Sequence, residues 1–200
     1  MATTGTDLNV LAEMRSIFVT EYARYKEAFR YAVNAIEIIP TEACDHMRNA
    51  FDHFSMATLT EWLASAPSSA DVAPPAVLAE LLEGAGETSS IDLNRSRKHI
   101  GIAAYFCFAH VIAHRMEQIA EIMASLPPSK AEEMRPLQGD LTTLGKRLEA
   151  LPPPPVERKE TLQLVLQDIA TIEKLNVDIG GIARDYDALL RKAYAASGAC

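Results

Sequence analysis

The chain of 200 residues has few aromatic residues, few cysteines and no excess of basic residues. Abundant aromatic residues, cysteines and basic residues are features of β-rich, disulfide-stabilised and nucleic-acid-binding proteins, respectively. Aromatic residues make up only 6% of this chain, whereas 48% of its residues are hydrophobic, with many alanines and leucines, and this mixture favours helices over strands. A net charge of −8 argues against a broad basic surface for duplex nucleic acid. It leaves room for a small site that contacts a few phosphates.

Cysteines are also scarce, since only Cys44, Cys107 and Cys200 are present. Their odd number and spacing do not resemble a disulfide framework or a zinc site, so we expect two core thiols and a terminal one in a reducing cytoplasm. No apolar run reaches about 18 residues without charge, so no membrane span is expected. Met1 to Asp7 has no basic n-region, so no signal peptide is expected, and no glycine-rich loop predicts a cofactor.

Apolar residues that recur every three or four positions predict an all-α fold. The sequence predicts helices at about 7–38, 41–64, 91–126, 130–151 and 156–195, with a short helix at 76–83 in a long loop. We expect an antiparallel helical bundle of about five helices, whose first, third and last helices are long. Residues 1–151 would form the bundle domain, and a polyproline linker would let the C-terminal helix, within 156–200, pack on the bundle or on a partner subunit.

Serine, proline and glycine residues give these helices their expected details. Ser89 or Ser90 is expected to cap the third helix, and Pro136 and Gly139 to interrupt the fourth. Gly180-Gly181 predicts a kink in the last helix. The apolar stretch 100–113 is typical of a central helix that is covered on nearly every side.

Polar residues form a stripe on each of two predicted helices. Glu42, His46, Asn49 and His53 share one side of the second helix, and Arg95, His99, Phe106 and His110 share one side of the third. If the two helices pack antiparallel, His46 is expected near the level of His110, and His53 near residue 103. The sequence therefore predicts a polar groove lined by histidines.

The six residues Arg48-Asn49-Ala50-Phe51-Asp52-His53 carry the only recognisable motif. They resemble the Arg-polar-x3-His signature of the HEPN superfamily, a group of all-α domains. Many of these domains are metal-independent ribonucleases, and others are inactive helical modules of defence and toxin–antitoxin systems. The resemblance implies that Arg48 and His53 form the active centre, that Asn49 supports it, and that two copies assemble one composite site as a homodimer.

The chemistry that this resemblance implies is coherent. The 2′-OH of RNA is the nucleophile, a histidine moves the proton, and an arginine neutralises charge at the phosphorus, so no metal is required. Arg97, Lys98 and His99 belong to the one dense basic cluster of the chain and have no place in the motif. Their charge alone suggests contacts with RNA phosphates.

Three structural alternatives remain open. Arg48 can form an ion pair on its own helix with Asp52 or Asp45, and His53 can be a histidine at the edge of the core. The whole protein can be a non-catalytic bundle that binds a protein partner or another copy of itself. A metal-binding bundle is the third alternative, because His110 and His114 are four residues apart.

Overall fold

The computed structural model describes residues 4–65, 85–155 and 161–198, and all regular structure in these ranges is helical. The elements are α1 (Thr4–Ile36), α2 (Thr41–Ser65), α4 (Ala85–Ser125), a short 3₁₀ turn η1 (Pro128–Lys130), α5 (Ala131–Glu149) and α6 (Leu162–Ser197). The expected all-α bundle of about five helices is confirmed. The short helix expected at 76–83 lies outside the described residues.

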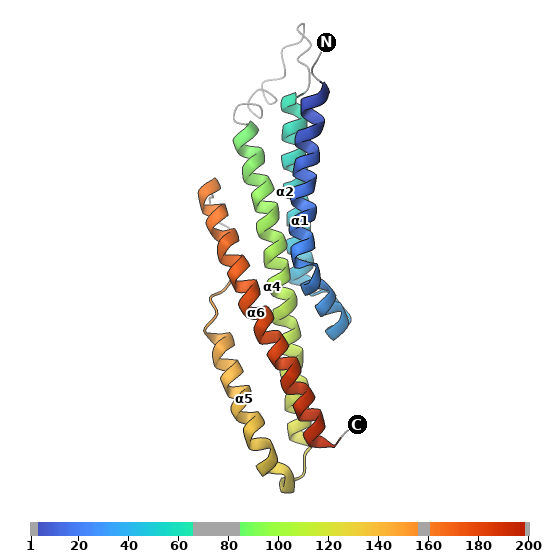
Figure 1. Ribbon diagram of the computed structural model, residues 1–200, viewed down its shortest axis with the longest axis vertical. Helices are drawn as coiled ribbons and strands as arrows, with labels where there is room; N and C mark the ends of the chain where they lie inside the picture. The colour runs from blue at the N-terminus through green and yellow to red at the C-terminus, as the bar shows by residue number, and fades with distance from the viewer. Residues whose placement is uncertain (1–3, 66–84, 156–160, 199–200) are drawn as a thin grey trace.

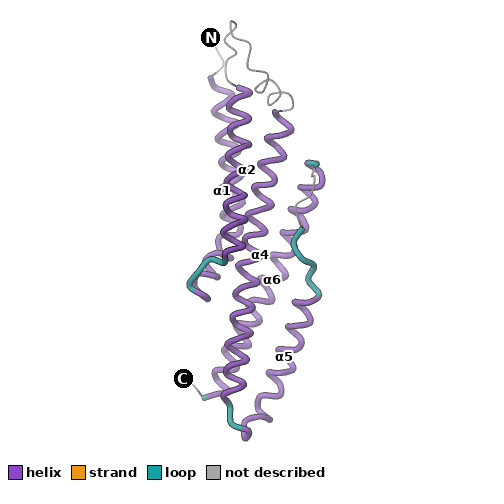
Figure 2. The backbone as a smooth tube through the Cα atoms, turned by 180° about the vertical axis from the view of Figure 1, so that it is seen from behind, coloured by secondary structure: helices purple, strands orange, loops and turns teal. Residues whose placement is uncertain are grey.

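The long helix α4 is the central element of the molecule (Figure 1). α1 and α2 lie beside its first half, while α5 and the end of α6 accompany its second half, and the view from behind shows the same division (Figure 2). α4 packs against α1, α2 and α6, and α5 packs against α6. The C-terminal helix therefore packs on the bundle of its own chain.

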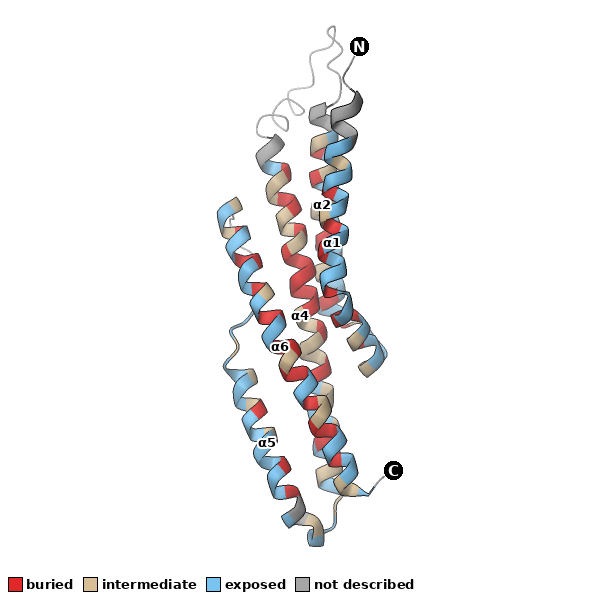
Figure 3. Ribbon diagram, viewed as in Figure 1, coloured by how far each residue is buried: buried red, intermediate tan, exposed pale blue. Residues whose placement is uncertain are grey.

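Burial follows this arrangement, because the deepest residues line the middle of α4 (Figure 3). Ile100, Ala103 and Cys107 are fully buried, which confirms that 100–113 is the central helical segment. One hydrophobic cluster joins α1, α2 and α4, and a second joins α4, α5 and α6. Each half of the molecule is thus a three-helix packing unit that includes part of α4.

The start of α4 differs from the expected one. α4 begins at Ala85, six residues before the expected start near residue 91, so Ser89 and Ser90 lie inside the helix and do not cap it. The Ser89 hydroxyl instead donates a hydrogen bond to the carboxylate of Glu61 on α2. A polar contact between two helices has taken the place of a local cap.

The expected interruption of α5 is wrong, because the helix runs through Pro136 and Gly139. Pro136 lies in an early turn, where its missing N–H removes one helical hydrogen bond. Leu137 and Leu144 lie on the same side of α5 and are buried against α6, and this packing outweighs the weak local propensity. α6 is also a single helix through Gly180 and Gly181, and the kink expected there stays a prediction.

Local contacts define both the start and the end of α6. The Thr161 hydroxyl caps its start by accepting a hydrogen bond from the N–H of Leu164, and Gly198 ends it with a left-handed φ of 72°.

Within the described ranges, no helix combines the length and the apolar character that crossing a membrane requires.

Candidate functional site

Three histidines meet where α2 packs on α4. The ring of His99 from α4 lies between the rings of His46 and His53 from α2, with centroid separations of 5.1 and 5.4 Å. The ring of Phe106 stacks on the other side of His46 at 5.5 Å. We call this row of Phe106, His46, His99 and His53 the histidine ladder. It is the place where the two predicted stripes meet.

The ladder has a different register from the one expected. His46 lies opposite His99 and Phe106, not beside His110, because α4 begins six residues earlier than expected and every level shifts by about that amount. Nε2 of His110 instead lies 3.1 Å from Oε2 of Glu42 at an exposed position. The pKa of Glu42 is lowered, mainly by a hydrogen bond from its own backbone N–H and further by His110.

A carboxylate holds one end of the ladder. Nδ1 of His53 lies 3.0 Å from Oδ1 of Asp92, and Arg95 donates to the same oxygen at 3.3 Å. A carboxylate at Nδ1 favours the tautomer with its proton there, which leaves Nε2 as an acceptor. The His53 side chain is 27% exposed, so this oriented imidazole is within reach of solvent. An imidazole held in this way can act as a general acid or base.

Arg48 and Asn49 lie on the exposed side of α2. The Arg48 guanidinium is 72% exposed and lies 3.1 Å from the carboxylate of Asp45, one of the two ion pairs considered for it. At about 100° per residue, Arg48 and His53 are separated by roughly 140° around α2. Within one chain, the structure therefore does not bring the arginine and the histidine of the motif together.

The basic cluster of α4 points into the protein. Arg97 donates to Oε2 of Glu21 at 3.1 Å, and Lys98 donates to Oδ2 of Asp168 at 2.9 Å. The side chain of Lys98 is only 1% exposed, and His99 is buried to the same degree in the ladder. The expectation that Lys98 and His99 contact RNA phosphates does not fit this burial, because neither presents surface to a ligand.

The partners of these cations were not among the expected site residues. The burial of Asp168 could have been predicted from the sequence, because this residue lies on the apolar stripe of α6 between Val165 and Ile172. A carboxylate on an apolar stripe requires a cation or hydrogen-bond donors, since an isolated buried charge is costly. Asp92 precedes the apolar stretch of α4, and Glu21 lies among exposed neighbours on α1. Their partners could not be assigned from spacing.

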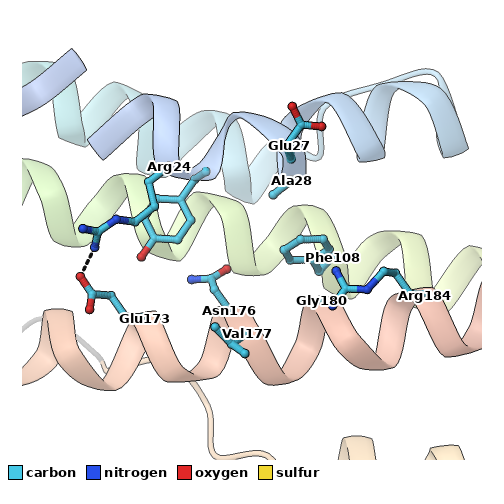
Figure 4. A pocket seen from close by; sticks show the side chains of 10 residues that line it. Arg24, Glu27, Ala28, Phe108, Glu173, Asn176, Val177, Gly180 and Arg184 are labelled. Atoms are coloured by element: carbon cyan, nitrogen blue, oxygen red, sulfur yellow. Dashed lines mark hydrogen bonds and ion pairs between the residues drawn. The ribbon is translucent and has the colours of Figure 1, made fainter. Parts of the chain in front are cut away.

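A cleft of about 460 Å³ lies between α1 and α6, with α4 behind it (Figure 4). Phe108, Ala28 and Val177 supply apolar surface, while Arg24 on one wall pairs with Glu173 on the other. None of the motif residues lines this cleft. Because its opposed rim charges pair across it, the cleft offers mainly an apolar surface.

Two residues fix the back of this cleft. Nδ2 of Asn176 donates to the backbone carbonyls of Gly101 at 2.9 Å and Ile172 at 3.0 Å. Burial raises the pKa of the Tyr25 phenol to about 12, and Glu21 adds to the rise. The amide of Asn176 therefore joins α6 to α4, and Tyr25 is a buried side chain of the core.

Metal chemistry finds no support in the described ranges. There, no three His, Cys, Asp or Glu side chains converge in a way that could hold a metal ion. The buried thiol of Cys107 has a pKa raised to about 12 by desolvation, which disfavours the thiolate that a metal or a nucleophilic reaction needs. His110, which the metal-binding alternative used, contacts Glu42.

No protein-family model matches this sequence, and neither a curated protein nor a solved structure matches it. Any functional conclusion therefore depends on the residues and their geometry.

Proposed function

We propose that the protein is a self-associating helical module that binds a second copy of itself through the outward side of α2. This side carries a row of exposed residues, which we call the α2 stripe: Arg48, Phe51, Ser55, Leu59 and Trp62. Phe51 is 52% exposed and Trp62 is 58% exposed. Large aromatic side chains in this state are enriched at protein interfaces, where their burial dominates binding.

The symmetry of the α2 stripe is the observation that carries the proposal. Its members are separated by three, four, four and three residues, so the order is the same in both directions about Ser55. At about 100° per residue they span roughly 80° of the helix surface. A twofold axis through Ser55 would place two α2 helices antiparallel, as an interface between identical surfaces requires.

The residues that would meet in this arrangement are complementary. Phe51 of one copy would pack on Leu59 of the second, which buries apolar surface on both sides. Arg48 would lie against Trp62 of the second copy, where a guanidinium over an indole ring is stabilised by a cation–π contact. The small side chain of Ser55 would let the helices approach at the axis. The Asp45 contact of Arg48 is exposed and therefore weak, so it does not oppose this pairing.

A cross-linking experiment tests the axis directly. Ser55→Cys is made in a background with Cys44→Ser and Cys200→Ser, and a short bismaleimide is added to the full chain. Because the residue on a twofold axis faces its own copy, we expect a covalent dimer at micromolar protein. Ser125→Cys is the matched control, since Ser125 is also exposed but lies at the far end of α4.

The affinity of association gives a second measurement. Sedimentation velocity should show a dimer for the wild-type chain and at least tenfold weaker association for Trp62→Ser, about 1.4 kcal/mol or more. Tyr194→Ser removes an exposed aromatic side chain from α6 and should leave association unchanged. A wild-type chain that stays monomeric at 100 μM, or equal cross-linking of S55C and S125C, would refute the proposal.

A metal-independent endoribonuclease, of the defence or toxin type that the HEPN resemblance implies, is the second candidate. The observation that favours it is the His53 imidazole, which is partly exposed and held by Asp92. In this proposal His53 accepts the proton of the RNA 2′-OH as that oxygen attacks the phosphorus, and passes it to the 5′-oxygen that leaves. Arg48 neutralises the phosphate, and Asn49 orients the substrate. Since Arg48 and His53 diverge on one α2 helix, Arg48 would have to come from a second copy.

RNA cleavage in the presence of EDTA tests this candidate. We expect wild-type protein to cut single-stranded RNA to 2′,3′-cyclic phosphate ends, and His53→Ala and Arg48→Ala to be at least a hundredfold slower. Association separates the two candidates. If the self-association proposal holds, Arg48→Ala weakens the dimer because it removes a contact of the α2 stripe, whereas His53→Ala leaves the dimer intact. Wild type and both variants that are equally inert would exclude the nuclease.

A further inference from the structure

We propose that the His46–His99 pair makes the packing of α2 on α4 sensitive to mild acid, so that α2 is released when both imidazoles bind a proton. The pair lies on the inward side of α2, away from the α2 stripe, and the proposal does not depend on self-association or on RNA cleavage. Nδ1 of His46 lies 2.9 Å from Nδ1 of His99. This distance is that of a hydrogen bond between the two rings.

The hydrogen bond limits how many protons the pair can hold. One neutral ring donates its Nδ1–H and the other accepts through an unprotonated Nδ1. A first proton can bind Nε2 of the donor ring, which makes the hydrogen bond charge-assisted and preserves it. A second proton must bind the accepting Nδ1. It would remove the hydrogen bond and place two cations in direct contact.

The surroundings prevent a simple escape. His99 is 1% exposed, and its ring is held between the rings of His46 and His53, so it cannot turn toward water without breaking the ladder. The low dielectric of a buried site strengthens the repulsion between like charges. The second proton is therefore excluded while α2 and α4 remain packed.

The charged groups around the ladder already have partners on the same or a neighbouring helix. Asp92 of α4 contacts His53 and Arg95, Glu42 of α2 contacts His110, Glu61 of α2 accepts from Ser89, Glu21 of α1 contacts Arg97, and Asp168 of α6 contacts Lys98. On the outward side of α2, Asp45 contacts Arg48 and Asp52 is exposed. His53 does not add to the repulsion in the same way, since a protonated His53 still faces the carboxylate of Asp92.

The direction of the pH effect follows from proton counting. Two imidazoles released into water each bind a proton near pH 6.5, whereas the packed pair binds one proton fewer. The released state therefore gains population as pH falls, by about tenfold for each pH unit below about 6.5. The contact contributes its full stability above that pH and loses it in acid.

Hydrogen exchange of the full-length protein tests the proposal at pH 7.2 and pH 5.2, after correction for the intrinsic exchange rates. We expect the opening equilibrium of the α2 amides to rise about twentyfold in the wild type, since pH 5.2 lies about 1.3 units below 6.5. In His46→Gln, the amide can donate to neutral His99 or accept from charged His99, so the rise should be less than threefold. His110→Gln is the matched control, because it removes an exposed histidine from the same pair of helices and should behave as wild type.

A second measurement keeps the test decisive if His46→Gln does not fold. NMR of the ¹⁵N-labelled wild-type imidazoles reports protonation directly, and in the folded protein only one of the two rings should be protonated at pH 5.5. Protonation of both rings above pH 6 in the packed state would overturn the proposal. So would an unchanged wild-type opening equilibrium at pH 5.2, or a pH response that His46→Gln leaves intact.

Discussion

The ammonium group of Lys98 lies 2.9 Å from Oδ2 of Asp168, and this contact joins α4 to α6 inside the core. Both side chains are almost completely removed from solvent. A buried ion pair loses much of its Coulomb attraction to the cost of desolvating two charges. Removing either partner would leave the charge of the other buried alone. A single variant and a double variant of the pair should therefore differ in stability.

Asp168→Ala should destabilise the protein by about 3–5 kcal/mol, because it leaves the Lys98 charge buried without this carboxylate. Replacing both residues by apolar ones, as in Lys98→Met with Asp168→Leu, should cost much less. Urea unfolding followed by circular dichroism measures both variants. A double variant as unstable as the single one would show that the pair does more than balance its own charges.

Neighbouring glycines on α6 should respond to alanine in opposite ways. A Cβ on Gly180 would lie 3.1 Å from Cζ of Phe108, whereas a Cβ on Gly181 would meet no atom within 4 Å. Gly181→Ala should raise the free energy of unfolding by about 0.5–1 kcal/mol through helix propensity. Gly180→Ala should not gain this benefit, because the ring of Phe108 must move. Thermal unfolding of the two variants side by side decides the point.

A tighter approach occurs at Gly101 in the centre of α4. A Cβ there would lie 2.6 Å from Cγ2 of Ile172, so Gly101→Ala should destabilise the protein by about 1–3 kcal/mol through overpacking. Ile172→Leu lacks this Cγ2 branch and keeps the size of the side chain. It should recover some of the lost stability when combined with Gly101→Ala, and simple additivity of the two changes in urea unfolding would contradict this explanation.

The two thiols of α2 and α4 should differ strongly in reactivity. Burial raises the pKa of the Cys107 thiol to about 12, so only about one molecule in 10⁴ carries the thiolate at pH 8. Cys44 is exposed. Iodoacetamide at pH 8 should label Cys44 within minutes and leave Cys107 unlabelled until urea is added, as peptide mass spectrometry can show. Equal labelling of both thiols in the native protein would contradict the packing around Cys107.

Alkaline pH should weaken the contact between α1 and the rest of the core. The pKa of Tyr25 rises to about 12, first through burial and then through the negative charge of Glu21. A phenol whose pKa is higher in the folded protein stabilises it below the unfolded pKa, near 10, and this stability is lost as pH rises from about 10 to 12. Tyr25→Phe should therefore show a smaller loss of stability over this pH window in urea unfolding.

Helix type and the central position of α4 could be predicted from the sequence because they depend on periodicity alone. The stretch 100–113 is apolar on nearly every side, and the structure packs it against α1, α2 and α6, with Ile100, Ala103 and Cys107 fully buried. The start of α4 could not be predicted in the same way. Ser89 has the local character of a cap, yet its hydroxyl bonds Glu61 across the α2–α4 contact, and a single helix's pattern contains no information on that partner.

The candidate site was predicted in part. The two polar stripes indicated that histidines of α2 and α4 meet, and three of them do meet in the ladder. The pairing of His46 with His99 depends on register, which shifted with the early start of α4. The role of Lys98 was the least predictable, because a basic cluster in sequence predicts a solvated surface unless the position of Asp168 on another helix is known.

The two hydrophobic clusters share α4, since each half of the molecule completes its core with a different length of the same helix. Removing α1 and α2 would leave the apolar sides of residues 93–111 facing water, and removing α5 and α6 would do the same to Ile112 and Ile119. Neither half is thus equipped to fold by itself. Because one continuous helix belongs to both cores, the two cores should unfold together. Heating the intact chain should therefore give one transition in which all helices melt together.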